Sequence, residues 1–281
     1  MHMIDVQNQA DHRNINIDKV GVKNIRYPIT VLDRENGHQH TVASINMYVN
    51  LPRKFKGTHM SRFIEILNDF HGQLDIREFS RVLEAMQERL RAESAHLEVS
   101  FPYFIKKTSP VTCSPGLMEY GCRMIGALSS DHGYDLILEV NVPITTVCPC
   151  SREISNHGAH NQRGMVRLAV RFKRFIWIED LVRQVESAAS CDVFSVLKRP
   201  DEKFVTERAY ENPKFVEDVV RDIAAQLKQD ANVLWFQVDV ENFESIHNHS
   251  AYAYIERTKV QRSEIENQEP ELARWRPEAG H

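Results

Sequence analysis

The feature that most constrains the fold is a repeated order of hydrophobic periodicities. Apolar residues alternate with polar ones in five segments, residues 45–51, 97–105, 136–144, 166–172 and 234–240. This two-residue period predicts half-buried β-strands. Apolar residues recur at helical spacing in residues 61–70, 79–90, 178–189 and 215–227, which predicts amphipathic helices packed on the strands. We therefore expect an α+β fold.

The predicted elements follow the same order in both halves of the chain. Each half reads ββααββ, and no repeat of individual residues accompanies this order. In the first half, Asp75 suits a helix cap; in the second, Asn212 and Pro213 suit the start of a helix. We predict two tandem units, each an antiparallel four-stranded sheet with two helices on one face. Their open sheet edges favour oligomers.

These units divide the chain into four parts. We expect a flexible arm over residues 1–18, a first unit over 19–130, a second unit over 131–260 and a polar tail over 261–281. The second unit carries the residues with the most distinctive chemistry. The charged segment 198–203 lies between its two predicted helices, and we expect it to be a loop.

Composition argues against several classes of protein. The chain has 281 residues and a net charge of -4, which gives no indication of a nucleic-acid or membrane binder. No apolar run approaches the roughly 18 residues that span a bilayer, and the polar N-terminus does not resemble a secretory signal. Five cysteines, an odd number, suit a reduced protein better than a disulfide scaffold. We expect a cytoplasmic location.

Residues 145–164 concentrate candidate metal ligands between two predicted strands. Cys148 and Cys150 flank a proline, and His157 and His160 follow them. Thiols and imidazoles in one connection indicate a metal or thiolate site. Two ordinary thiols, a redox pair or solvated histidines would give the same pattern.

A second candidate group lies near the end of the chain. After the predicted strand that ends at Glu241, the sequence NFESIHNH places His247 and His249 in a hairpin connection. On these residues alone, a polar turn is the favoured interpretation.

Four motifs together resemble the type IB GTP cyclohydrolases. They are KGTHMSRF at residues 56–63, CPCSREIS at 148–155, HNQR at 160–163 and ENFESIHNHSAYAYIE at 241–256. The resemblance extends over about residues 18–257. It implies the tunnelling fold, whose unit is ββααββ, and a homotetramer with active sites at subunit interfaces.

The resemblance also implies a metal site. Its ligands would be Cys148, His160, Glu202 and His247, with Asp201 as an alternative to its neighbour Glu202. A thiolate, two imidazoles and a carboxylate suit a divalent ion such as zinc, manganese or iron(II).

Substrate-binding residues follow from the same resemblance and from charge. Glu217 would accept two N–H groups of guanine, although a surface glutamate on a helix is the ordinary alternative. Lys56, His59 and Arg62 belong to a basic cluster that suits the triphosphate, and a neighbouring subunit could supply them. A solvated basic loop is the competing interpretation.

The implied reaction is the metal-assisted hydrolysis of GTP to 7,8-dihydroneopterin triphosphate and formate. Water made acidic by the metal attacks C8, a second hydrolysis releases formate, and the ribose carbons close the new ring. Beside the ligand Cys148, the candidates for proton transfer are His157, His249 and Cys150. Both tetrahydrofolate and queuosine biosynthesis can start from this product.

Three other functions are compatible with parts of the sequence. A tunnelling-fold nitrile reductase would use Cys148 as a nucleophile with NADPH and no metal, which leaves His160 and His247 without a role. A non-catalytic protein with a closed metal site would release no formate. A redox dithiol would pair Cys148 with Cys150.

Overall fold

The computed structural model describes residues 7, 12–70, 72, 74–76 and 78–259. Eight strands form its sheet: β1 (Ile17–Asp33), β2 (Gly37–Leu51), β3 (Ser94–Thr108), β4 (Pro115–Ser129), β5 (Gly133–Val147), β6 (Asn161–Phe172), β7 (Val233–Asn242) and β8 (Ala251–Thr258). Six helices accompany them: α1 (Met60–Asp69), α2 (Phe79–Leu90), α3 (Pro149–Ile154), α4 (Ile178–Ala188), α5 (Arg199–Glu211) and α6 (Val216–Gln229).

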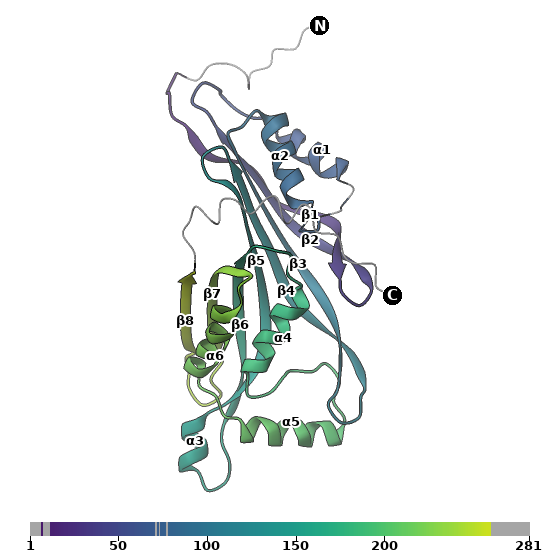
Figure 1. Ribbon diagram of the computed structural model, residues 1–281, viewed down its shortest axis with the longest axis vertical. Coiled ribbons are helices and arrows are strands. Elements are labelled where there is room, and N and C mark those ends of the chain that lie inside the picture. Colours follow the sequence, from purple (N-terminus) through teal and green to yellow (C-terminus); the bar gives the residue numbers. More distant parts are fainter. Residues whose placement is uncertain (1–6, 8–11, 71, 73, 77, 260–281) are drawn as a thin grey trace.

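The strands form one antiparallel sheet in which their order is the same as in the sequence (Figure 1). The register places one residue of each central strand in a single row across the sheet: Ile45, Val99, Met124, Leu138, Val170 and Phe236. All of these side chains are buried. The row crosses from β4 to β5, so the two predicted units share one continuous sheet.

Helices cover the face on which this row lies. Buried side chains of α1, α2, α4 and α6 join those of the strands in one apolar cluster. Gly126 on β4 lies so close to α2 that a Cβ atom there would be 2.4 Å from Cε1 of Phe79. An antiparallel sheet covered by helices on one face confirms the predicted α+β fold.

The opposite face is polar and carries ion pairs between neighbouring strands. Arg123 pairs with Glu98 at 3.0 Å, and Arg167 pairs with Asp239 at 3.0 Å. Tyr252 also donates a hydrogen bond to Asp239. Burial raises the pKa of the Asp239 carboxyl, but the hydrogen bonds it accepts outweigh burial and hold the pKa below its ordinary value.

The second half differs from the prediction because it contains a third long helix. The segment 198–203, expected to be a loop, begins α5, with Lys198 as its N-cap. Asn212 was wrongly predicted to start a helix. It ends α5 instead, and its Nδ2 donates to the carbonyl of Ala189 at 3.0 Å. The next helix, α6, begins at Val216.

Two smaller differences concern connections. The connection between β5 and β6 contains the short helix α3. Asp75 does not cap α2: the helix starts at Phe79, and Asp75 accepts a hydrogen bond from the backbone of Glu78 in the preceding turn.

Several predicted boundaries are only partly described. Most of the predicted arm and the tail 261–281 lie outside the described residues, and β1 already begins at Ile17. The division near residue 130 falls in the turn between β4 and β5, and it stays a prediction. Among the helices of the described part, none combines the length and the apolar character that a membrane crossing requires.

Candidate active site

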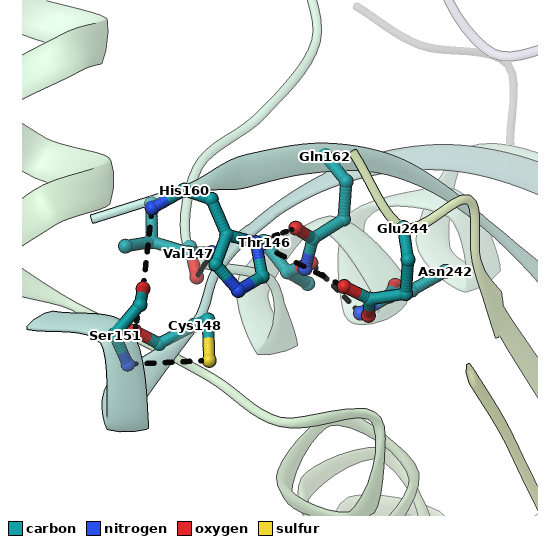
Figure 2. Close-up of polar contacts among 9 residues, drawn as sticks. Thr146, Val147, Cys148, Ser151, His160, Gln162, Asn242 and Glu244 are labelled. Atoms are coloured by element: carbon teal, nitrogen blue, oxygen red, sulfur yellow. Dashed lines mark hydrogen bonds and ion pairs between the residues drawn. The ribbon is translucent and has the colours of Figure 1, made fainter. Parts of the chain in front are cut away.

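Cys148 lies where β5 ends and α3 begins. It is the N-cap of α3, and its Sγ accepts a hydrogen bond from the backbone N–H of Ser151 at 3.5 Å. Its own N–H donates to the carbonyl of His160 at 3.1 Å. The Ser151 hydroxyl accepts a hydrogen bond from the N–H of His160, also at 3.1 Å. This short turn holds the thiol and the imidazole next to each other (Figure 2).

The neighbouring Gln162 orients the His160 ring. His160 Nδ1 lies 2.9 Å from Gln162 Oε1. An amide oxygen only accepts hydrogen bonds, so this contact selects the tautomer with the proton on Nδ1, in which the neutral ring has its lone pair on Nε2. In Figure 2 this second nitrogen faces the side on which Cys148 lies. A histidine held in this way is ready to bind a metal through Nε2.

Cys148 and Glu217 line one cavity of about 240 Å³. The carboxylate of Glu217 is exposed in the first turn of α6. Lys214, Phe215 and Glu244 also line this cavity. The structure thus places the predicted thiolate ligand beside the residue predicted to bind guanine.

The other two predicted metal ligands, Glu202 and His247, lie apart from Cys148 and His160. Glu202 is half-exposed in the first turn of α5, and its carboxylate pairs with Arg199 at 3.0 Å. His247 lies in the connection between β7 and β8, where its ring stacks on that of His249 with centroids 5.1 Å apart. In the part of the chain that the structure describes, no three His, Cys, Asp or Glu side chains gather closely enough to hold a metal.

The donor chemistry of Cys148 and His160 nevertheless fits a divalent metal. A soft thiolate and an imidazole with a directed lone pair are two of the donors that zinc and iron(II) prefer. Glu202 and His247 lie on segments that must approach this pair to complete a four-ligand site.

Asp201, the alternative ligand, is engaged elsewhere. The buried carboxylate accepts hydrogen bonds from Val111 N and Thr112 N at 2.8 Å, Thr112 Oγ1 at 2.6 Å and Lys198 N at 2.9 Å. Burial raises the pKa of this carboxyl, but these donors outweigh burial and hold the pKa far below its usual range. Asp201 fastens α5 to the turn between β3 and β4, which leaves the exposed Glu202 as the available carboxylate.

The predicted proton-transfer residues lie outside the cavity. His157, Cys150 and His249 are exposed and do not line it. All five cysteines are free thiols, so the structure shows no bond between Cys148 and Cys150.

The predicted triphosphate cluster lies at the opposite end of the sheet. The cluster follows the end of β2 and consists of Lys56, His59 and Arg62. Near that end, Val49 lies in a row across the sheet that passes through β3 and β4 to Tyr134, near the start of β5. Cys148 follows the other end of β5. Fourteen residues separate Tyr134 from Cys148, which at about 3.3 Å per residue corresponds to roughly 45 Å. Arg62 Nη1 also donates to the carbonyl of Arg89 at 3.2 Å, at the end of α2.

Sequence reasoning did not identify a buried polar group beneath the cavity. Gln162 Nε2 donates to Thr146 Oγ1 at 3.0 Å, and Asn242 Nδ2 donates to the same oxygen at 2.8 Å (Figure 2). Glu244, the carboxylate of the connection after β7, was given no role from the sequence: its Oε2 lies 3.8 Å from His160 Nδ1. The alternation of side chains along a strand was the signal that could have identified Gln162 as a neighbour of His160, because residues two apart lie on the same face of the sheet.

The chain forms one helix-covered antiparallel sheet whose two halves follow the ββααββ order, with α3 and α5 added in the second half, and this arrangement is a tunnelling fold. Two solved structures have a similar fold: the uricase of Arthrobacter globiformis and the urate oxidase of Bacillus subtilis 168. Each has a TM-score of 0.51, with 7% and 9% sequence identity; the matches cover 86% of this chain and 93% and 98% of theirs. At such identity, the likeness concerns the fold alone.

Sequence comparison identifies the family. The family model for type I GTP cyclohydrolase folE2 matches residues 3–253. GTP cyclohydrolase FolE2 of Syntrophobacter fumaroxidans is 77% identical over 92% of this chain and all of its own length. The FolE2 protein of Desulfosudis oleivorans is 60% identical over 90% of this chain and 97% of its own. The chain belongs to the type IB (FolE2) family of GTP cyclohydrolases.

Proposed function

We propose that this chain hydrolyses GTP to 7,8-dihydroneopterin triphosphate and formate with the help of a divalent metal. The observation that carries the proposal is the cavity that Cys148 and Glu217 share, beside an imidazole whose Nδ1 is held 2.9 Å from Gln162 Oε1. The matching FolE2 relatives are named GTP cyclohydrolases and support the choice of substrate.

Cys148 and His160 would hold the metal first, and Glu202 and His247 would complete the site. A divalent metal bound there supplies a water molecule that is acidic near neutral pH. Zinc, manganese and iron(II) all suit this mixture of donors. Gln162 keeps the proton on Nδ1 of His160, so the imidazole binds with the correct nitrogen.

Glu217 would select the purine. Its exposed carboxylate lines the cavity and can accept two parallel N–H donors, which the guanine edge offers and adenine does not. His157, His249 and Cys150 remain the candidates for proton transfer, and the segments that carry them would have to move toward the cavity.

The separation of about 45 Å between the two ends of β5 supports an oligomeric site. One chain cannot bring Cys148 and the basic cluster to a single GTP molecule, but a second copy can. Among the described strands, β1 and β8 pair on one side only, so both edges can take up a strand of another chain. We propose a homotetramer with active sites at subunit interfaces, acting in the cytoplasm at the first step of tetrahydrofolate or queuosine synthesis.

GTP turnover tests the proposal directly. Metal-stripped protein should release formate and form a pterin, detected by its fluorescence after oxidation, when manganese, zinc or iron(II) is restored. Cys148→Ala should abolish both signals, whereas Cys113→Ala, at an exposed thiol, should keep them. A folded oligomer that releases no formate with any of the metals would refute the proposal. Oxidation of NADPH in the presence of a nitrile would then favour the reductase.

A further inference from the structure

We propose that Thr146 is a positioning residue for the metal site: its hydroxyl ties together the strand ends next to Cys148 and His160 and the end of β7, which leads to the connection that carries His247. This inference rests on the proposed function, because it concerns the site of Cys148 and His160. Thr146 contacts neither metal nor substrate in this proposal and acts through Gln162 and Asn242.

The group is fully buried and joined at one atom. Thr146 is 0% exposed, Asn242 2% and Gln162 7%. Thr146 Oγ1 accepts one hydrogen bond from each of the two amides. A hydroxyl oxygen can accept two hydrogen bonds, so both acceptor positions are used.

Each member of the group lies close to a predicted ligand in the sequence. Thr146 on β5 is two residues before Cys148, and Gln162 on β6 is two residues after His160. Asn242 is the last residue of β7, directly before the connection that carries His247. Gln162 continues the network to Nδ1 of His160. The hydroxyl therefore fixes three neighbouring strand ends relative to each other.

Gly164 provides the space that this arrangement needs. It is the cross-strand partner of Asn242, and a Cβ atom at residue 164 would lie 2.4 Å from Asn242 Oδ1. Any larger residue would push the amide out of its place. The place of the Asn242 side chain therefore explains why residue 164 of β6 is a glycine.

Loss of the hydroxyl should weaken metal binding through Gln162. Without an acceptor for its Nε2, the Gln162 amide loses the contact that orients it, and the His160 ring loses its oriented partner at Nδ1. Partners that orient a ligand in this way typically change metal affinity by 10- to 100-fold.

Thr146→Val and Thr146→Ser form the matched test. Valine keeps the shape and removes the hydroxyl, while serine keeps the hydroxyl. Zinc affinity of the full chain, measured by competition with a chelator, should fall by roughly 10- to 100-fold in Thr146→Val and stay near the wild-type value in Thr146→Ser. A residue with only a structural role would change the melting temperature of the metal-free protein and leave the affinity of the folded protein unchanged.

An affinity of folded Thr146→Val within about twofold of wild type would overturn the inference, since a lost orienting contact costs about 10-fold or more. If Thr146→Val fails to fold, Asn242→Ala replaces it, and unchanged zinc affinity in that variant would count equally against the inference. Cys148→Ala separates the two proposals. If it binds zinc as the wild type does, the proposed metal site itself is wrong; if it loses zinc while Thr146→Val does not, only the role of Thr146 fails.

Discussion

The distance between the predicted ligands and the predicted cations leads to a prediction about mixed oligomers. A Cys148→Ala chain lacks a metal ligand but keeps the basic cluster. A chain with Lys56→Ala and His59→Asn lacks two members of the cluster but keeps the ligands. Arg62 is left in place because its guanidinium caps α2, and asparagine at residue 59 suits the N-cap of α1. Each oligomer alone should be nearly inactive on GTP.

The structure sets the size of the expected recovery. Roughly 45 Å along β5 separates the two groups in one chain, so the proposed function requires each site to combine ligands from one chain with cations from another. In a random equal mixture, half of the sites have an intact ligand chain, and half of those have an intact cluster. About one quarter of the wild-type activity should therefore return in a symmetric oligomer.

Coexpression with two different affinity tags, followed by purification on both tags, provides mixed oligomers for a formate assay. As a control, Cys148→Ala mixed with Arg174→Ala, at an exposed position that belongs to neither group, should show about half of the wild-type activity by the same counting. No recovery in verified mixed oligomers would refute the assignment of the two groups to different chains. Full activity of the Lys56 and His59 double variant alone would refute the triphosphate role of the cluster.

Three further predictions test particular contacts. Asp201→Asn should lower both the melting temperature and the metal affinity, measured by thermal shift and chelator competition, whereas Glu202→Gln should lower the affinity alone. The folded pKa of Asp239 is lowered, so its contribution to stability is present above its unfolded pKa, near 4, and is lost as the pH falls. Urea unfolding at several pH values should show less acid destabilisation in Asp239→Asn than in wild type. Gly126→Ala should cost about 1–3 kcal/mol of unfolding free energy through overpacking against Phe79, and Phe79→Leu in the same chain should recover part of it.

Strands were predictable from the sequence because one face of the sheet is buried throughout. Leu136, Leu138 and Val140 point to the core in β5, as their alternation predicts. A shift of the register by one residue would move the whole apolar set to the polar face, so the pattern determines both where the strand lies and which of its side chains are buried. The pairing of β4 with β5 into one sheet carries no comparable signal, since it depends on the short turn between the two halves.

The helix α5 was missed because it has little apolar character to detect. Only Asp201 and Ala209 are buried among its residues, so no helical stripe appears in the sequence. The helix is instead fastened by hydrogen bonds at its two ends, to the turn at Val111 and Thr112 and to the carbonyl of Ala189. Periodicity cannot report a helix that is held in place by its caps and not by a face.

The polar network beneath the site was hidden for a different reason, although the sequence does contain its signal. In β5, β6 and β7, the core-facing positions are even-numbered, and each stripe reaches a polar residue at the end nearest the site: Thr146, Gln162 and Asn242. A single polar residue in such a stripe is costly unless it is paired. Three of them on adjacent strands can form hydrogen bonds with one another, so their coincidence predicts a hydrogen-bonded group before any coordinates are known. Such a group fixes the strand ends from which Cys148 and His160 extend, whereas the remaining ligands depend on a helix and a connection outside the core. Strand periodicity in the sequence therefore indicates how Cys148 and His160 are brought together, whereas it carries no comparable signal for where Glu202 and His247 lie.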